Sequence, residues 1–212
     1  MKKNKIAEAL LSIGAVSLRP HDPFTWSSGM KSPIYCDNRL TMSFPDVRKE
    51  IIAHFVAMIQ ANYPEAEVIA GTATAGIPHA AWVADRLDLP MIYVRSKAKG
   101  HGKENLIEGA LTAGKNVVVI EDLISTGGSS IQAAKAVQEA GGKVLAVASI
   151  FTYELAQGKA QFAQSGIPSL SLTTYTELLK EAVALGVISE EDRLLLEKWR
   201  ENPQEWSNRH TG

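Results

Sequence analysis

Four short, largely apolar runs separated by helical segments constrain the fold of this chain more than any other feature. Helical spacing of apolar residues predicts helices at 78–87 and 129–140. A half-exposed strand alternates polar and apolar residues, whereas continuous apolar strands that alternate with helices indicate a parallel sheet covered on both faces. The sequence therefore predicts an α/β, doubly wound fold with a mainly parallel central sheet flanked by helices. The predicted strands are Val68–Ala70, Met91–Val94, Val117–Ile120 and Val144–Ile150.

The segments on either side of this region predict a small N-terminal element, here called the hood, and a C-terminal helical extension. Residues 19–39 contain several Pro and Gly residues, which predicts short strands and turns, and apolar spacing predicts flanking helices that end at Gly14 and begin at Phe44. Two helical stretches joined by Gly186 predict a hairpin, and the residues from Asn202 are expected to fray. We expect one domain over 1–212, with the hood at about 1–43, the core at about 44–165 and the extension at about 173–205.

Charge and cysteine usage exclude several classes of protein. The chain has 22 Lys and Arg against 23 Asp and Glu, so no global field would draw it to nucleic acid or to an anionic membrane. No segment approaches the roughly 18 consecutive apolar residues of a membrane span, and the N-terminus lacks the apolar run of a signal peptide. Cys36 is the only cysteine, which excludes an internal disulfide and fits a reducing compartment. We expect a cytoplasmic protein that binds neither nucleic acid nor membrane.

The strongest chemical signal follows the strand 117–120. Glu121 and Asp122 stand at its carboxyl end, and the small residues of Ser125–Ser129 lead into the next helix. Backbone N–H groups of such a loop can surround a phosphate at a helix N-terminus, and acids at a strand end can meet sugar hydroxyls or the water shell of magnesium. The Walker lysine and the Gly-x-Gly-x-x-Gly pattern are absent, which excludes a nucleoside triphosphate or dinucleotide loop. The segment predicts a sugar-phosphate site.

Two further segments extend this prediction to a pyrophosphate. Gly71–Gly76 joins a strand to a helix and offers free backbone donors to an anion. Residues 95–103 are rich in Lys and Arg and contain two glycines, a composition typical of a solvated surface when it occurs alone. Beside a pyrophosphate site, such a cationic segment can act as a lid that neutralises charge on the leaving group.

The acid pair directly before Ser-Thr-Gly-Gly resembles the phosphate loop of the type I phosphoribosyltransferase family. The resemblance implies that fold, with the loop at the 5-phosphate of phosphoribosyl pyrophosphate (PRPP) and the acids at its ribose. It implies a pyrophosphate loop made of Thr72, Ala73, Thr74, Ala75 and Gly76, although some relatives carry a Lys at Ala75. It implies catalytic roles for Lys99, His101 and Asp122. The implied PRPP-binding residues are Arg95, Lys99, His101, Glu121, Asp122, Leu123, Ile124, Ser125, Thr126, Gly127, Gly128 and Ser129.

Within that family, Phe24–Arg39 and the pair Lys99 and His101 resemble the orotate phosphoribosyltransferases. The resemblance implies transfer of phosphoribosyl from PRPP to orotate, which yields orotidine 5-monophosphate and pyrophosphate in de novo pyrimidine (UMP) synthesis. It implies orotate contacts from Ser125, Lys31 and Tyr35. Magnesium would be held mainly by PRPP, with no direct protein ligand. A homodimer is implied, in which each lid reaches the neighbouring subunit's site.

Two alternatives stay open. A phosphoribosyltransferase for a purine base would share the loops and differ in the hood. A regulator that senses PRPP and binds nucleic acid would carry an added basic domain and a degraded lid, and this sequence has neither. Other relatives also have a Lys at Ser27 and an Arg near Thr152, so the residues that replace these base contacts are not evident from the sequence.

Overall fold

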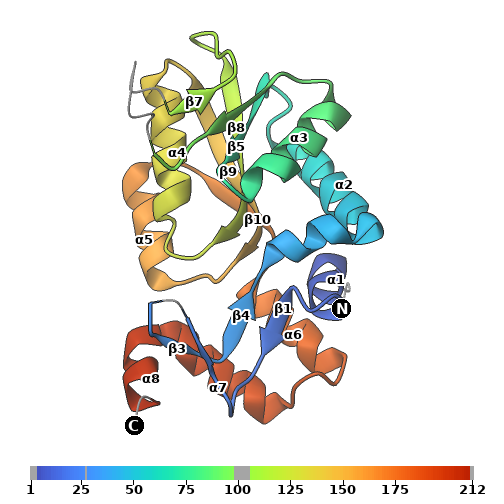
Figure 1. Ribbon diagram of the computed structural model, residues 1–212, viewed down its shortest axis with the longest axis vertical. Helices are drawn as coiled ribbons and strands as arrows, with labels where there is room; N and C mark the ends of the chain where they lie inside the picture. The colour runs from blue at the N-terminus through green and yellow to red at the C-terminus, as the bar shows by residue number, and fades with distance from the viewer. Residues whose placement is uncertain (1–3, 27, 98–105, 211–212) are drawn as a thin grey trace.

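The computed structural model describes residues 4–26, 28–97 and 106–210. Its centre is a six-stranded sheet in the order β10-β9-β8-β5-β6-β7 (Figure 1). Neighbouring strands run parallel, except that β7 is antiparallel to β6. The predicted fold class, a mainly parallel sheet in an α/β protein, is confirmed. The strands are β5 (Val68–Thr72), β6 (Met91–Val94), β7 (Ile107–Glu108), β8 (Asn116–Ile124), β9 (Lys143–Thr152) and β10 (Ser169–Thr174).

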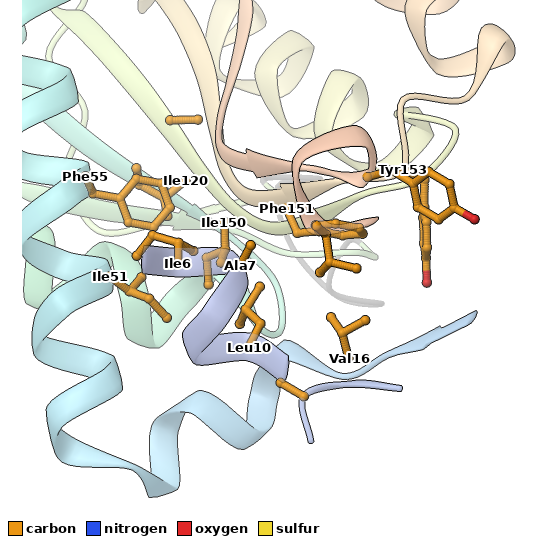
Figure 2. Packing of buried hydrophobic residues seen from close by; sticks show 14 of the residues in the cluster. Ile6, Ala7, Leu10, Val16, Ile51, Phe55, Ile120, Ile150, Phe151 and Tyr153 are labelled. Carbon is orange, nitrogen blue, oxygen red and sulfur yellow. The ribbon is translucent and has the colours of Figure 1, made fainter. Parts of the chain in front are cut away.

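Helices cover both faces of the sheet, as the continuous apolar strands predict (Figure 1). Successive strand residues point to opposite faces, so each central strand contributes to two cores. Ile120 packs on the face covered by α1, α2 and α3, whereas Val119 packs on the face covered by α4 and α5. Figure 2 shows the first core, where Ile51 and Phe55 of α2 meet Ile120. The helices of these layers are α1 (Lys5–Ser12), α2 (Pro45–Asn62), α3 (Gly76–Leu87), α4 (Gly128–Glu139) and α5 (Ala156–Ser165).

The hood and the C-terminal extension lie side by side at one end of the molecule (Figure 1). The backbone N–H of Lys31 in the hood donates to Ser207 Oγ in the extension at 2.8 Å, and Asn4 N–H donates to Glu181 Oε2 at 3.4 Å. The two ends of the chain therefore form one layer. The hood contains β1 (Val16–Leu18) paired with β4 (Ile34–Cys36), β2 (Phe24–Thr25) paired with β3 (Lys31–Ser32), and a 3-10 helix, η1 (Asn38–Ser43); the extension contains α6 (Tyr175–Ala184), α7 (Glu190–Glu201) and α8 (Pro203–Arg209).

Two local expectations are wrong. The strand predicted to end at Ile120 continues as β8 to Ile124, because hydroxyl and backbone donors satisfy the Glu121 carboxyl group inside the structure. The residues after Asn202 form α8 rather than a frayed end. The Asn202 side chain caps this helix by accepting the N–H of Glu205 at 3.1 Å, and Pro203 occupies its first turn.

The structure also contains two elements in a stretch for which the sequence predicted none. α5 covers one face of the sheet, and β10 pairs in parallel with β9 to form the edge of the sheet. The apolar pattern in each of these two segments is too short to predict its secondary structure. Packing against the sheet therefore determines that they form a helix and a strand. Within the described ranges, no helix combines the length and apolar composition needed to cross a bilayer.

Candidate active site

The site lies where the strand order reverses. From β5 the chain proceeds to β6 on one side, and β8 pairs with β5 on the other side. In open α/β sheets, ligands bind at the carboxyl ends of the strands that flank such a point. The turn 73–75 follows β5 and the turn 125–127 follows β8, so the two loops predicted to bind anions emerge next to each other.

A cavity of about 370 Å³ lies between these strand ends and the hood. It brings together predicted residues that are far apart in the sequence, since the turn after β5 faces the acid pair and the start of α4. We call it the acid-pair cavity. Its lining residues are Ala73, Thr74, Ala75, Glu121, Asp122, Leu123 and Ser129, with Cys36, Asp37 and Arg39 from the hood.

Glu121 forms the buried floor of the acid-pair cavity and is 4% exposed. Its Oε1 accepts the backbone N–H of Asp122 at 3.1 Å, and its Oε2 accepts the hydroxyl of Ser130 at 3.1 Å. Burial raises the pKa of Glu121 to about 8, and repulsion by the Asp122 carboxylate adds to this shift. Glu121 therefore holds a proton near neutral pH, which it can release when a cation or hydroxyl donor binds.

Asp122 is positioned by the hood. The Asn38 side-chain amide donates to the Asp122 carbonyl oxygen at 2.7 Å, which ties η1 to β8. Burial raises the pKa of Asp122, although a hydrogen bond from Glu121 and the charge of Arg39 act in the opposite direction. Arg39 pairs with Asp37 at 2.6 Å. The sequence analysis assigned no role to Asp37, Asn38 or Arg39, although a polar Asp-Asn-Arg run directly after the strand β4 is a signal that could have found them.

The turn after β8 has the features of an anion site. Within the described residues, the backbone N–H groups of Ser125, Thr126 and Gly127 donate to no protein acceptor. Three adjacent free donors before a helix N-terminus are suited to a phosphate. Gly127 has φ +84°, and a Cβ there would lie 2.8 Å from the Phe162 ring. A Cβ at Gly128 meets nothing within 4 Å, and Gly128 has no positive φ, so the backbone excludes a side chain at Gly127 and not at Gly128.

The turn after β5 depends on the close approach of α3 to β8. A Cβ at Gly76 would lie 2.5 Å from the carbonyl oxygen of Ile120, so only glycine fits there. The Ala73 N–H donates to the Val94 carbonyl at 2.9 Å, and the Ala73–Thr74 peptide bond is cis. Thr72 is buried at the end of β5. Of the predicted pyrophosphate loop, residues 73–75 line the cavity. Thr72 and Gly76, the first and last residues of that loop, do not line it.

A second cavity of about 480 Å³, here called the aromatic cavity, opens beside the first. Ser125 and Tyr35, two of the residues that the family resemblance implies as orotate contacts, line it. The predicted residue Lys31 lies one contact away, since its ammonium group donates to the Thr25 hydroxyl at 2.9 Å. The two cavities share Cys36 and Leu123, so they are adjacent. The aromatic cavity is lined by Thr25, Trp26, Ser28, Tyr35, Cys36, Leu123, Ser125 and Tyr153.

Of the other predicted residues, Arg95, Ile124 and Thr126 line neither cavity. Arg95 follows β6, and its NH1 lies 3.5 Å from Glu108 Oε1 on β7. Its backbone N–H donates to the Leu106 carbonyl at 2.8 Å, so the first residue of the predicted lid, 95–103, pairs with a residue three positions beyond its end. Lys99 and His101 lie outside the described residues. Ile124 is buried at 4% exposure, and Thr126 is half-buried in the turn.

This fold, with two turns suited to anions where its strand order reverses, is the fold of the phosphoribosyltransferase class. The phosphoribosyl transferase domain family matches residues 47–164. The orotate phosphoribosyltransferase of Halalkalibacterium halodurans is 61% identical over 97% of this chain and 99% of its own length. On this similarity, the chain belongs to the orotate phosphoribosyltransferase family, as the sequence analysis expected.

Solved structures agree with this assignment. The orotate phosphoribosyltransferase of Aeropyrum pernix has a TM-score of 0.70 and 27% identity, with 85% of this chain and 99% of that chain covered. The enzyme of Mycobacterium tuberculosis, solved in complex with 5-phospho-alpha-D-ribosyl 1-diphosphate, has a TM-score of 0.64 and 25% identity, with 82% and 97% covered.

Proposed function

We propose that this chain transfers the phosphoribosyl group of PRPP to orotate, which yields orotidine 5-monophosphate and pyrophosphate. The observation that carries the proposal is the pair of adjacent cavities that share Cys36 and Leu123. One cavity has an acid pair and lies beside two anion-binding turns, and the other has aromatic walls suited to a planar base. The anomeric carbon of PRPP belongs at their junction, where the base nitrogen can reach it.

The reaction breaks the bond between the anomeric carbon and pyrophosphate and forms a bond to the base nitrogen. The protein contributes mainly position and charge compensation. The N–H groups of turn 125–127 hold the 5-phosphate, and turn 73–75 holds the pyrophosphate. Glu121 and Asp122 accept hydrogen bonds from the ribose hydroxyls. As carboxylates, with the Glu121 proton released on ligand binding, they stabilise the positive charge that develops on the ribose ring. Trp26 and Tyr35 enclose the base, and the Trp26 indole is fixed by its hydrogen bond to the Ile34 carbonyl at 3.2 Å.

The acid-pair cavity fits magnesium that arrives with PRPP. Within the described ranges, no three His, Cys, Asp or Glu side chains are grouped to hold a metal. Two adjacent carboxyl groups, Glu121 and Asp122, face the cavity. Magnesium keeps several waters and binds substrate phosphates, so PRPP would hold the ion while Glu121 and Asp122 face its water shell, with no direct protein ligand. When bound, the ion compensates negative charge on the pyrophosphate.

The cationic segment that follows Arg95 is proposed to act as a lid over the pyrophosphate, with Lys99 and His101 as its charged groups. The proposed assembly is a homodimer in which each lid serves the neighbouring site. The hydrogen bond between Arg95 and Leu106 supports the placement of the lid, because it fixes the chain on both sides of 98–105 at the end of β6, the strand next to β5. The proposed compartment is the cytoplasm.

A base-competition assay tests the function. Purified protein with PRPP and magnesium is offered orotate, adenine, hypoxanthine and uracil separately, and consumption of each base is followed by absorbance. We expect orotate alone to be consumed at a substantial rate. Turnover of a purine without orotate would assign the chain to the purine enzymes. PRPP binding without turnover of any base would favour a sensor instead.

A further inference from the structure

The C-terminal extension packs against the residues that line the aromatic cavity. Trp199 of α7 is fully buried, and its ring centroid lies 6.0 Å from that of Trp26 and 5.8 Å from that of Tyr153. Trp26 and Tyr153 both line the cavity. Their packing against Trp199 limits how far either ring can move away from a bound base, because protein interiors are close-packed.

A second contact reaches the hood strand on the other side of the cavity. Ser207 of α8 is 3% exposed, and its hydroxyl oxygen accepts the backbone N–H of Lys31 at 2.8 Å. Lys31 is directly opposite Thr25 in the β2–β3 pair, and its ammonium group also donates to the Thr25 hydroxyl. Thr25 lines the cavity. A pair of two-residue strands is marginally stable alone, so this partly buried hydrogen bond holds the cavity wall in place.

We propose that Trp199 and Ser207 are positioning residues for the base, so that the C-terminal extension determines affinity for orotate. The proposal rests on the proposed function, which assigns the base to the aromatic cavity. Residues that line the acid-pair cavity come from the sheet, its turns and the hood. The extension contacts Lys31, Trp26 and Tyr153, none of which lines the acid-pair cavity. Loosening the extension is therefore expected to act on the base rather than on PRPP. Figure 1 shows the arrangement, with α7 and α8 beside β3 and β4.

The decisive variant is Ser207→Ala, which removes one buried acceptor without adding volume. We expect KM for orotate to rise about fivefold or more while KM for PRPP changes by less than about twofold. The reason is that the Lys31 N–H loses its acceptor, so β3 and the cavity wall beside it become less rigidly held. The matched control is Ser189→Ala in the same extension. It removes the hydroxyl that accepts the Asp192 N–H at 3.0 Å at the start of α7. We expect it to lower the melting temperature and leave both KM values unchanged.

Trp199→Phe provides a second, independent variant if Ser207→Ala folds poorly. It keeps an aromatic ring behind Trp26 and Tyr153 but reduces its size, and the expected result is again a rise in KM for orotate alone. Equal changes in both KM values, or an unchanged KM for orotate in folded variants, would overturn the inference. If the wild-type protein consumes no orotate, the proposed function is refuted. If the wild type is active but the variants leave KM for orotate unchanged, only the positioning role of Trp199 and Ser207 is refuted.

Discussion

Glu121 is a carboxyl group whose chemistry depends on its position inside the sheet. Its sequence context, an acid after an apolar strand, predicts a ligand contact but says nothing of protonation. The structure buries it beside Asp122, and burial raises its pKa to about 8. The folded chain therefore retains a proton that the unfolded chain loses above its ordinary pKa of about 4.3.

This shift predicts how stability depends on pH. Between about pH 5 and 8 the folded state binds more protons at Glu121 than the unfolded state, so the free energy of unfolding falls as pH rises through this window. Glu121→Gln removes the titration and can still accept the Ser130 hydroxyl. Thermal unfolding without substrate should show a melting temperature that falls less steeply with pH in the variant. Parallel curves for the two proteins would contradict the assigned shift.

The turn from β8 into α4 is an element in which two adjacent glycines have different roles. Gly127 has a left-handed φ of +84° and no room for a Cβ beside the Phe162 ring, whereas Gly128 begins the helix and faces open space. If the 5-phosphate occupies that space, a side chain at Gly128 competes with the ligand and leaves the fold intact.

We therefore predict that Gly128→Val folds but is no longer stabilised by PRPP with magnesium. The wild type should gain about 2.7 kcal/mol at a hundredfold excess of ligand over its Kd. Melting curves with and without PRPP measure this difference. Gly127→Ala is the comparison variant, and it should be destabilised by about 1–3 kcal/mol even without ligand because of its φ and the Phe162 contact. If PRPP raised the melting temperature of Gly128→Val as much as that of the wild type, the 5-phosphate would not bind in this turn.

Segments that are far apart in the sequence line each cavity. In the proposed dimer, one active site also combines residues from two subunits. Asp122 belongs to the sheet, whereas Lys99 belongs to the lid segment. If the lid serves the neighbouring site, a heterodimer of one Lys99→Ala chain and one Asp122→Asn chain has one site with both residues intact.

Each variant alone should lose turnover by orders of magnitude, because each removes charge compensation in the transition state. After subunit exchange at equal amounts, half of the dimers are mixed and half of their sites are intact, so about one quarter of wild-type activity should return. Steady-state orotate consumption measures this recovery. No recovery after exchange verified by mass spectrometry would show that the lid acts within its own chain.

The sequence was sufficient for features that depend on neighbouring residues. Continuous apolar strands between helices require a sheet buried on both faces, which predicted the fold class, and an acid pair before a glycine turn predicted the position of a turn with free backbone N–H groups. Residue type and spacing carry these signals, because burial and backbone geometry act locally.

Contacts between distant segments could not be predicted in the same way. Asn38 meets Asp122, Lys31 meets Ser207, and β8 continues past Ile120 because Ser130 satisfies Glu121. Each of these depends on which surfaces meet when the chain folds, and no periodicity along the sequence encodes that. The contacts that the hood and the extension make, and the protonation of the acid pair, are therefore properties of the packed molecule, in which long-range hydrogen bonds and desolvation outweigh local preference.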